Sequence, residues 1–272
     1  MPLRRALVLI LALSTLGLVG LAPATSATAS PSPAPTSGCN LGLQPVAGPL
    51  DLPLGLIGAC PSVRPGSPVR TPLGLCSLNF MFKGSDGFTY MGTAGHCVLQ
   101  GTPTKEIAWG PGEGPPAADV NKNPIGRFAY AVQDGRRDFS LIRLIDGVQA
   151  NPQVCFFGGP TGLDNGPVQP LGSLHQFGQG RLFGAIIPAR SQLALEANPD
   201  QVLGAGLAAP GDSGGPLLTD DGRAAGVVVA TGPALLGLVA TGVVFSTRLG
   251  PQLQRATEVT GVRYELQTAP RL

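Results

Sequence analysis

Beyond the first 22 residues, glycine and proline interrupt the apolar runs of this chain, which limits it to short secondary-structure elements. The 272 residues include 40 glycines and 28 prolines, whereas charged residues make up only 12% and aromatic residues 5%. Glycine and proline weaken helix interiors and favour turns. Apolar residues still make up 43% of the chain, which can supply a packed core. We therefore predict an all-β fold built from many short strands.

The charge pattern argues against some classes of partner. The formal net charge is only +2, and no run of lysine and arginine occurs. Binding to nucleic acid or to an anionic membrane surface depends on clustered positive charge. We therefore expect neither of these partners.

The first 29 residues have the composition of an export signal. Arg4 and Arg5 precede the apolar stretch Ala6–Ala22, and small residues end at Ala29. We predict a signal peptide over residues 1–29, cleavage after Ala29 and a secreted protein. The alternative is an uncleaved anchor that tethers the protein to the membrane, because about 17 apolar residues are at the lower limit of a span.

The chain then divides into an extension and a patterned domain. Residues 30–72 are rich in proline, serine and glycine and show neither strand nor helix periodicity, which is typical of a linker and candidate propeptide. Regular patterning occupies residues 73–272. It begins with a predicted hairpin, in which the apolar segments 78–82 and 88–91 flank the turn Lys83–Gly87.

The rest of the domain also consists mainly of short strand patterns, followed by a short helix predicted over residues 247–257. The further strand candidates are residues 125–130, 139–144, 174–177, 181–187, 192–195, 201–207, 217–219, 224–230 and 238–246. Many short strands at regular spacing are typical of a β-sandwich or a β-barrel. His175 falls in one of them, and we interpret it as an ordinary strand residue.

Two short motifs both indicate a site with a nucleophilic serine and a histidine base. The run Gly211–Pro216 places Ser213 between glycines after an aspartate, and Thr93–Cys97 contains His96, one of only two histidines. A serine hydroxyl becomes a nucleophile when a base takes its proton. A metal site at His96 and Cys97 is a poorer reading, because adjacent residues rarely point at one ion.

Both motifs resemble those around the catalytic histidine and serine of the chymotrypsin-like serine proteases, most closely the compact secreted bacterial (streptogrisin-like) members. The resemblance implies two six-stranded antiparallel β-barrels, at about 73–150 and 151–272, with a C-terminal helix. It implies Ser213 as nucleophile, His96 as base, and the backbone N–H groups of Gly211 and Ser213 as the oxyanion hole. No cofactor is needed.

The same resemblance selects the acid that orients the histidine. The candidates between the motifs are Asp119, Asp134, Asp138 and Asp146, and Asp138 is preferred because a strand pattern follows it directly, as in the family.

Five cysteines in an exported chain should mostly be paired, and one must lack a partner within the chain. A bridge between Cys76 and Cys97 resembles the disulfide of the family's histidine loop. For the others, Cys39 with Cys60 is the simplest pairing, and a bridge from either to Cys155 is the alternative.

Several positions depart from the family pattern. Phe156 stands where compact bacterial members carry an arginine that pairs with the aspartate before the serine, here Asp212. Arg181 or Arg190 could substitute for it. Ala209 replaces a common cysteine, and the chain lacks the start sequence used for activation in animal zymogens.

The resemblance also indicates two substrate-binding segments. One contains Leu207, Ala208 and Pro210, and the other contains Thr231, Gly232 and Pro233. The first has no aspartate, so we expect a preference for uncharged, apolar side chains. Pro233 offers no N–H to an extended substrate.

We therefore predict a secreted, monomeric serine endopeptidase that hydrolyses protein or peptide substrates through an acyl-enzyme. One alternative is a binding protein on a protease fold with weak or no turnover. Another is an esterase-like hydrolase that uses the same triad.

Overall fold

A computed structural model describes residues 62–272, apart from residues 179, 181–187, 232–233, 236–238 and 241. All described residues belong to one compact unit, Ser37–Leu272. The expected signal peptide with its cleavage point, most of the expected extension and the strand predicted over 181–187 lie outside the described residues. Among the residues that are described, no helix has the length and apolar character needed to cross a membrane.

The eight strands of the first half and the C-terminal strand β17 form a nine-stranded antiparallel sheet. Its strand order is β17-β3-β4-β8-β7-β6-β1-β2, and β5 pairs with β7. The strands are β1 (Pro68–Thr71), β2 (Gly74–Ser77), β3 (Met81–Gly84), β4 (Thr89–Thr93), β5 (Glu106–Ala108), β6 (Pro116–Ala118), β7 (Pro124–Gln133), β8 (Asp138–Leu144) and β17 (Tyr264–Leu266).

This sheet differs from the expectation in two ways. The all-β class is confirmed, but the hydrogen-bond pattern of the first half gives an open sheet instead of a closed six-stranded barrel. In addition, β1 lies inside the stretch 30–72 that was expected to have no regular structure. Strand β1 has four residues and begins with a proline, so it has no local strand signal; its pairing with β2 and β6 makes it a strand.

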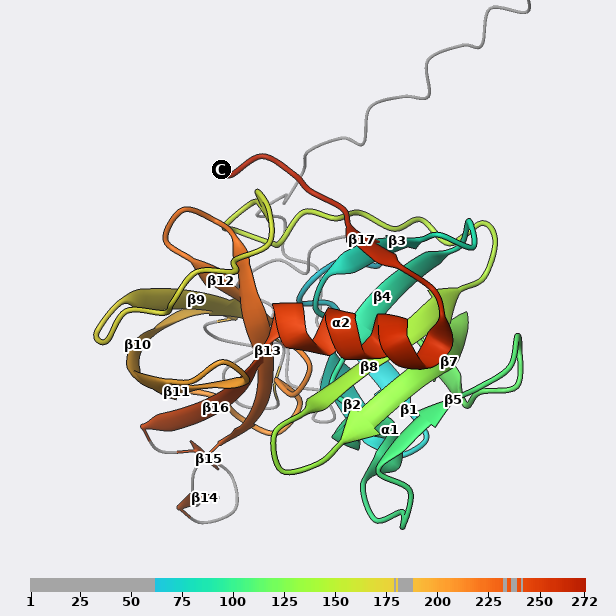
Figure 1. The fold of residues 1–272 in the computed structure, drawn as a ribbon, viewed down its shortest axis with the longest axis horizontal. Coiled ribbons are helices and arrows are strands. Elements are labelled where there is room, and N and C mark those ends of the chain that lie inside the picture. Colours follow the sequence, from blue (N-terminus) through green and yellow to red (C-terminus); the bar gives the residue numbers. More distant parts are fainter. Residues whose placement is uncertain (1–61, 179, 181–187, 232–233, 236–238, 241) are drawn as a thin grey trace, which may run out of the picture. The chain divides into compact units, whose positions relative to one another are not determined.

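The second half forms a closed antiparallel barrel with the strand order β10-β11-β16-β13-β12-β9 (Figure 1). Side chains alternate along its strands, and in β10 the residues Arg190, Gln192 and Ala194 point inward. The strands are β9 (Ser173–Phe177), β10 (Ala189–Ala197), β11 (Gln201–Ala205), β12 (Pro216–Thr219), β13 (Ala224–Thr231) and β16 (Val243–Arg248), with a small hairpin of β14 (Ala234–Leu235) and β15 (Val239–Ala240). The closed six-stranded barrel predicted for this half is confirmed.

One helix connects the two halves through a common core. Helix α2 (Leu249–Thr260) overlaps the helix predicted over residues 247–257, and it buries Leu249, Leu253 and Ala256. These residues belong to a core cluster that also contains Phe139 of the first sheet and Val227 of the barrel. Figure 1 shows α2 beginning beside β13 of the barrel and running in front of the strands of the first sheet. The core is therefore continuous across both halves.

Candidate active site

His96 is the first residue of the short helix α1 (His96–Leu99), which begins just after β4. Gly95 separates the two elements, and a side chain there would collide with the backbone oxygen of Val132. This close approach brings the start of α1 against β7 and β8. Asp138 is the first residue of β8, so the fold places it beside His96.

Asp138 holds His96 at two points. Its Oδ2 lies 2.8 Å from Nδ1 of the imidazole, and its Oδ1 accepts a 2.8 Å hydrogen bond from the backbone N–H of His96. An ionised carboxylate can only accept, so Nδ1 carries the proton and Nε2 keeps its lone pair. Asp138 is 6% exposed, and the His96 side chain is 19% exposed. The imidazole is therefore fixed in one tautomer with one nitrogen available as a base.

Ser213 lies on a tight loop between β11 and β12. Gly211 and Gly214 on either side have φ angles of 102° and 89°, which favour glycine. A side chain at Gly214 would also collide with Thr93 of the histidine motif, so the two motifs pack directly together. Within the described chain, the Ser213 hydroxyl donates to the Val229 carbonyl at 3.2 Å and is not bonded to His96.

Ser77 on β2 anchors this loop to the first sheet. Its hydroxyl donates to the Gly211 carbonyl at 2.7 Å, and its backbone N–H donates to the Ser213 carbonyl at 2.7 Å. The residue is fully buried. Sequence patterns gave no indication of Ser77, because a serine next to a cysteine carries no local signal for a contact more than 130 positions away.

Two backbone donors near Ser213 are available to a ligand. Among the described residues, no acceptor is hydrogen-bonded to the backbone N–H of Gly211 or of Ser213. Neighbouring groups of the same loop are bonded: the Gly214 N–H donates to Val228, and the Gly215 N–H donates to Asp212. Adjacent unpaired N–H groups can stabilise a negatively charged oxygen.

Arg190 on β10 is the ion-pair partner of Asp212. Its guanidinium donates two hydrogen bonds to the carboxylate, at 2.8 and 2.7 Å, and both side chains are buried. The backbone N–H groups of Gly180 and Ala209 donate to the same carboxylate. The sequence offered Arg181 or Arg190 for this role. The structure pairs Arg190, whereas Arg181 lies outside the described residues.

Buried glutamines hold the loop that contains Leu207, Ala208 and Pro210. The Gln176 amide donates to the Leu207 carbonyl at 2.7 Å, and Gln192 donates to the Gln176 side-chain oxygen at 3.1 Å. Ala208 is fully buried, whereas Leu207 is 41% exposed.

The second segment expected to bind substrate is only partly described. Thr231 ends β13, and Gly232 and Pro233 lie outside the described residues. The β13 residue that contacts Ser213 is Val229, two positions before Thr231.

The predicted bridge between Cys76 and Cys97 is confirmed, with an S–S distance of 2.00 Å. Both sulfurs lie close to His96, but a disulfide has no thiolate to offer a metal ion. Cys155 is buried and also disulfide-bonded. Its partner is outside the described residues, where Cys39 and Cys60 both fall, and this favours the alternative that one of these two pairs with Cys155.

Solved structures with the same fold are bacterial proteases. Thermobifida fusca Protease A matches with a TM-score of 0.54 and 20% identity, over 76% of this chain and 100% of that chain. Nocardiopsis protease matches with a TM-score of 0.52 and 17% identity, over 75% of this chain and 98% of that chain. Cellulomonas bogoriensis chymotrypsin matches with a TM-score of 0.51 and 20% identity, over 75% of this chain and 99% of that chain. No curated protein sequence matches the chain.

The sequence also matches a family model. The model described as Trypsin covers residues 87–243, which is more than half of the chain and includes His96, Asp138 and Ser213. The protein therefore belongs to the trypsin family of serine endopeptidases.

Proposed function

We propose that this protein is a secreted endopeptidase in which Ser213 attacks the peptide carbonyl, His96 transfers the proton and Asp138 orients His96. The observation that carries the proposal is the two-point attachment of Asp138 to His96. It selects the tautomer in which Nε2 can accept a proton, which is the protonation state required of a general base.

In the proposed first step, the Ser213 hydroxyl leaves the Val229 carbonyl and turns toward Nε2 of His96. Catalytic hydrogen bonds of this kind often form only when substrate is bound. The oxygen of Ser213 then bonds to the substrate carbonyl carbon, and its proton passes to Nε2. His96 gives that proton to the leaving amine, and an acyl-enzyme forms. His96 then takes a proton from water as the water oxygen bonds to the acyl carbon, and it returns this proton to the Ser213 oxygen as the ester bond breaks and the acid leaves.

The unpaired N–H groups of Gly211 and Ser213 support a role as the oxyanion hole. The carbonyl oxygen becomes negatively charged during the attack, and two preorganised donors stabilise that charge without rearrangement. Ser77 and Arg190 support this geometry from the two halves of the domain, since Ser77 holds the Gly211 carbonyl and Arg190 holds Asp212 between the two donors.

We further propose that substrates present an uncharged, apolar side chain next to the cleaved bond. The loop Leu207–Pro210 contains no carboxylate that could attract lysine or arginine, and Ala208 is small and buried. The Cys76–Cys97 disulfide and the apolar N-terminal stretch support export, because disulfides persist in oxidising compartments.

Active-site labelling tests the proposal, and the chain contains its own control. A second hydrogen-bonded set of Ser191, His175 and Asp220 lies on the barrel surface, with the imidazole 2.8 Å from the serine and 2.7 Å from the aspartate. A fluorophosphonate probe should label the wild-type and Ser191→Ala chains but not Ser213→Ala. Equal labelling of the wild-type and Ser213→Ala chains would refute the assignment.

Turnover assays separate the rival functions. Casein hydrolysis that is lost in Ser213→Ala would exclude a binding protein without turnover. Peptide and ester chromogens with the same acyl group would separate an endopeptidase from an esterase. If only the ester is cleaved, the endopeptidase proposal is wrong.

A further inference from the structure

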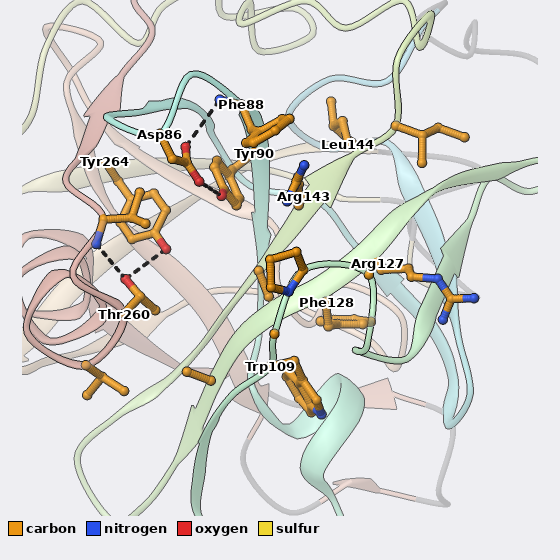
Figure 2. Close-up of a pocket in the computed structure, with 18 of the residues that line it drawn as sticks. Asp86, Phe88, Tyr90, Trp109, Arg127, Phe128, Arg143, Leu144, Thr260 and Tyr264 are labelled. Atoms are coloured by element: carbon orange, nitrogen blue, oxygen red, sulfur yellow. Dashed lines mark hydrogen bonds between the residues drawn. The ribbon is translucent and has the colours of Figure 1, made fainter.

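Cavities of small-molecule size lie outside the proposed catalytic triad. One, of about 650 Å³, lies on the first sheet, where the Arg143 guanidinium lies over the Phe88 ring (Figure 2). Among the described residues that line it, no buried side-chain polar atom lacks a hydrogen-bond partner. A second cavity, of about 600 Å³, lies in the second half of the domain and is lined by a residue with such an atom, Arg248. A buried donor without a partner is rare and, beside a cavity, indicates a site for an ion or a ligand.

The second cavity lies where three segments of the chain meet. These are the loop 163–168, the end of β10 with the turn that follows it, and the start of α2. Each segment contributes one proline to the lining, namely Pro167, Pro199 and Pro251. A proline ring has a fixed φ and no N–H that needs an acceptor. The walls are therefore largely preformed, and they border the first turn of α2.

This first turn has no negatively charged group of its own. It contains no acidic residue, and no side chain caps the helix. Gly250 lines the cavity. Its backbone N–H cannot bond within the helix, and no other described group accepts from it. Because the start of a helix carries a partial positive charge, this end of α2 favours an anionic ligand.

Arg248 is the second feature that indicates an anion. It directly precedes α2 and lines the cavity, and its side chain is 10% exposed. Its Nη2 donates to the Gly166 carbonyl and to Oδ2 of Asp164. Its Nε is buried without a partner, and Nη1 has no acceptor among the described residues. Since Nη2 is occupied and Nε is buried, Nη1 is the donor that a ligand can reach.

Asp164 neutralises this arginine only in part. Its Oδ2 lies 3.4 Å from Nη2 of Arg248, whereas charge-assisted hydrogen bonds measure about 2.7–2.9 Å. Its Oδ1 accepts the backbone N–H of Gly166 at 3.1 Å. By contrast, Arg190 donates to both oxygens of Asp212, at 2.8 and 2.7 Å. The single long contact to Asp164 leaves Arg248 able to bind a second anionic group.

We propose that the cavity at the start of α2 binds a tetrahedral oxyanion, phosphate or sulfate, either free or as the ester group of a small molecule. The oxyanion accepts hydrogen bonds from Nη1 of Arg248 and from the backbone N–H of Gly250. Its several oxygens suit donors that come from a side chain and from a helix end. This site is separate from the proposed peptidase function and makes no use of Ser213.

Asn165 allows the site to be blocked without disturbing the core. It is exposed and lines the cavity, and its Oδ1 lies 3.1 Å from the position that a Cβ of residue 250 would occupy. Asn165→Asp therefore places a carboxylate beside the start of α2, where it competes with the oxyanion. The matched control is Gln169→Glu, which adds the same charge at an exposed residue outside the cavity.

An NMR titration tests the proposal. The ¹⁵N-labelled protein carries Ser213→Ala, which prevents self-cleavage, and sodium phosphate replaces sodium chloride at constant pH and ionic strength. The backbone amide signal of Gly250 and the Nε–H signal of Arg248 should shift together along one saturating curve. We expect a Kd of about 10 mM or lower. Sodium chloride alone should produce no saturating shift of these two signals.

The variants then locate the anion. Asn165→Asp should weaken phosphate binding at least about tenfold, because two negative charges would lie close together. Gln169→Glu should change the Kd by less than about twofold, since its charge is farther away and screened by salt. Absence of a saturating shift, a shift of Gly250 without Arg248, or the same Kd in both variants would each overturn the proposal.

A second titration identifies the source of the oxyanion. Inorganic phosphate represents the free ion, and N-acetyl-O-phospho-L-serine represents an ester group on a small molecule. Tighter binding of inorganic phosphate assigns the cavity to the free ion, and tighter binding of the ester assigns it to phosphorylated molecules. Because binding is measured in Ser213→Ala, its result is independent of the proposed peptidase activity.

Discussion

Arg190 on β10 makes a two-point ion pair with Asp212, the residue directly before Ser213. Their side chains are 5% and 2% exposed, so the pair is almost fully removed from water. Removing one partner of a buried ion pair leaves an uncompensated charge, which costs about 3–5 kcal/mol. The pair therefore fixes the loop on which Gly211 and Ser213 lie.

We predict that Arg190→Met lowers the free energy of unfolding by about 3–5 kcal/mol, measured by urea denaturation. The control is Arg223→Met, which breaks an exposed ion pair with Asp221 and should cost about 1 kcal/mol or less. If both variants lose the same small amount, Arg190 does not hold a buried charge in place.

Asp138→Asn should lower kcat by about 10³–10⁴, because an amide can donate to Nδ1 and select the wrong tautomer of His96; this magnitude is the one given by the worked example for the family. Asp134→Asn is the matched control, since Asp134 is a nearby carboxylate bound to Arg137 and to backbone N–H groups. Its kcat should stay within a few-fold of the wild-type value. Equal losses in the two variants would contradict the role of Asp138.

The glutamine contacts to the loop at Leu207 should matter for stability and for activity. Gln176→Met removes the donor to the Leu207 carbonyl and should cost about 1–3 kcal/mol, together with a lower kcat/KM. Gln252→Met is the control, because that buried glutamine has no side-chain partner among the described residues. It should be neutral or stabilising. A similar loss of kcat/KM in both variants would show that the loop contact is unimportant.

Peptide mapping of the non-reduced protein should recover two disulfides and one free thiol. One disulfide joins Cys76 to Cys97, and the second should join Cys155 to Cys39 or Cys60. Mass spectrometry after alkylation identifies the remaining cysteine. A free Cys155 would contradict the buried disulfide seen at this position.

Glu106 should make stability depend on pH in the acid range. Hydrogen bonds from Arg255 and Tyr130 lower the pKa of its carboxyl from the ordinary value of 4.5. The unfolded chain then binds more protons than the folded chain between the two pKa values, so this stabilisation is present above about pH 4.5 and lost as the pH falls. In urea denaturation at a series of pH values, the wild type should lose more stability on acidification than Glu106→Gln. Glu258→Gln, at a more exposed position, should behave like the wild type.

Elements whose residues follow a regular apolar spacing could be predicted from the sequence. The strand after Asp138 and the short helix near residues 247–257 were predicted from residue spacing, and the structure contains β8 and α2 at those places. The closed barrel of the second half came from the resemblance. The strand order of the first sheet could not be predicted in the same way, because β1 and β17 become strands only through pairing with distant partners.

The residues that position the candidate site also depend on contacts between distant parts of the chain, which local patterns do not reveal. The sequence could name two arginines as partners for Asp212, but only the fold shows that Arg190 points into the barrel toward it. Ser77 carried no signal at all, because its two contacts join opposite ends of the domain. The candidate catalytic residues can be recognised from short motifs. The residues that hold them in place can be identified only from the folded structure.

The two hydrogen bonds from Ser77 to the loop at Ser213 couple activity to the completion of folding. The N-terminal half contributes His96, Asp138 and Ser77, and the C-terminal half contributes Ser213 and Arg190. Under the proposed mechanism, a chain still emerging from the ribosome would have the proposed base, His96, without the proposed nucleophile, Ser213. Even a complete chain has no anchored Gly211 carbonyl until β2 meets the loop. In the proposed mechanism, the site is therefore complete only when both halves of the domain have folded and packed together.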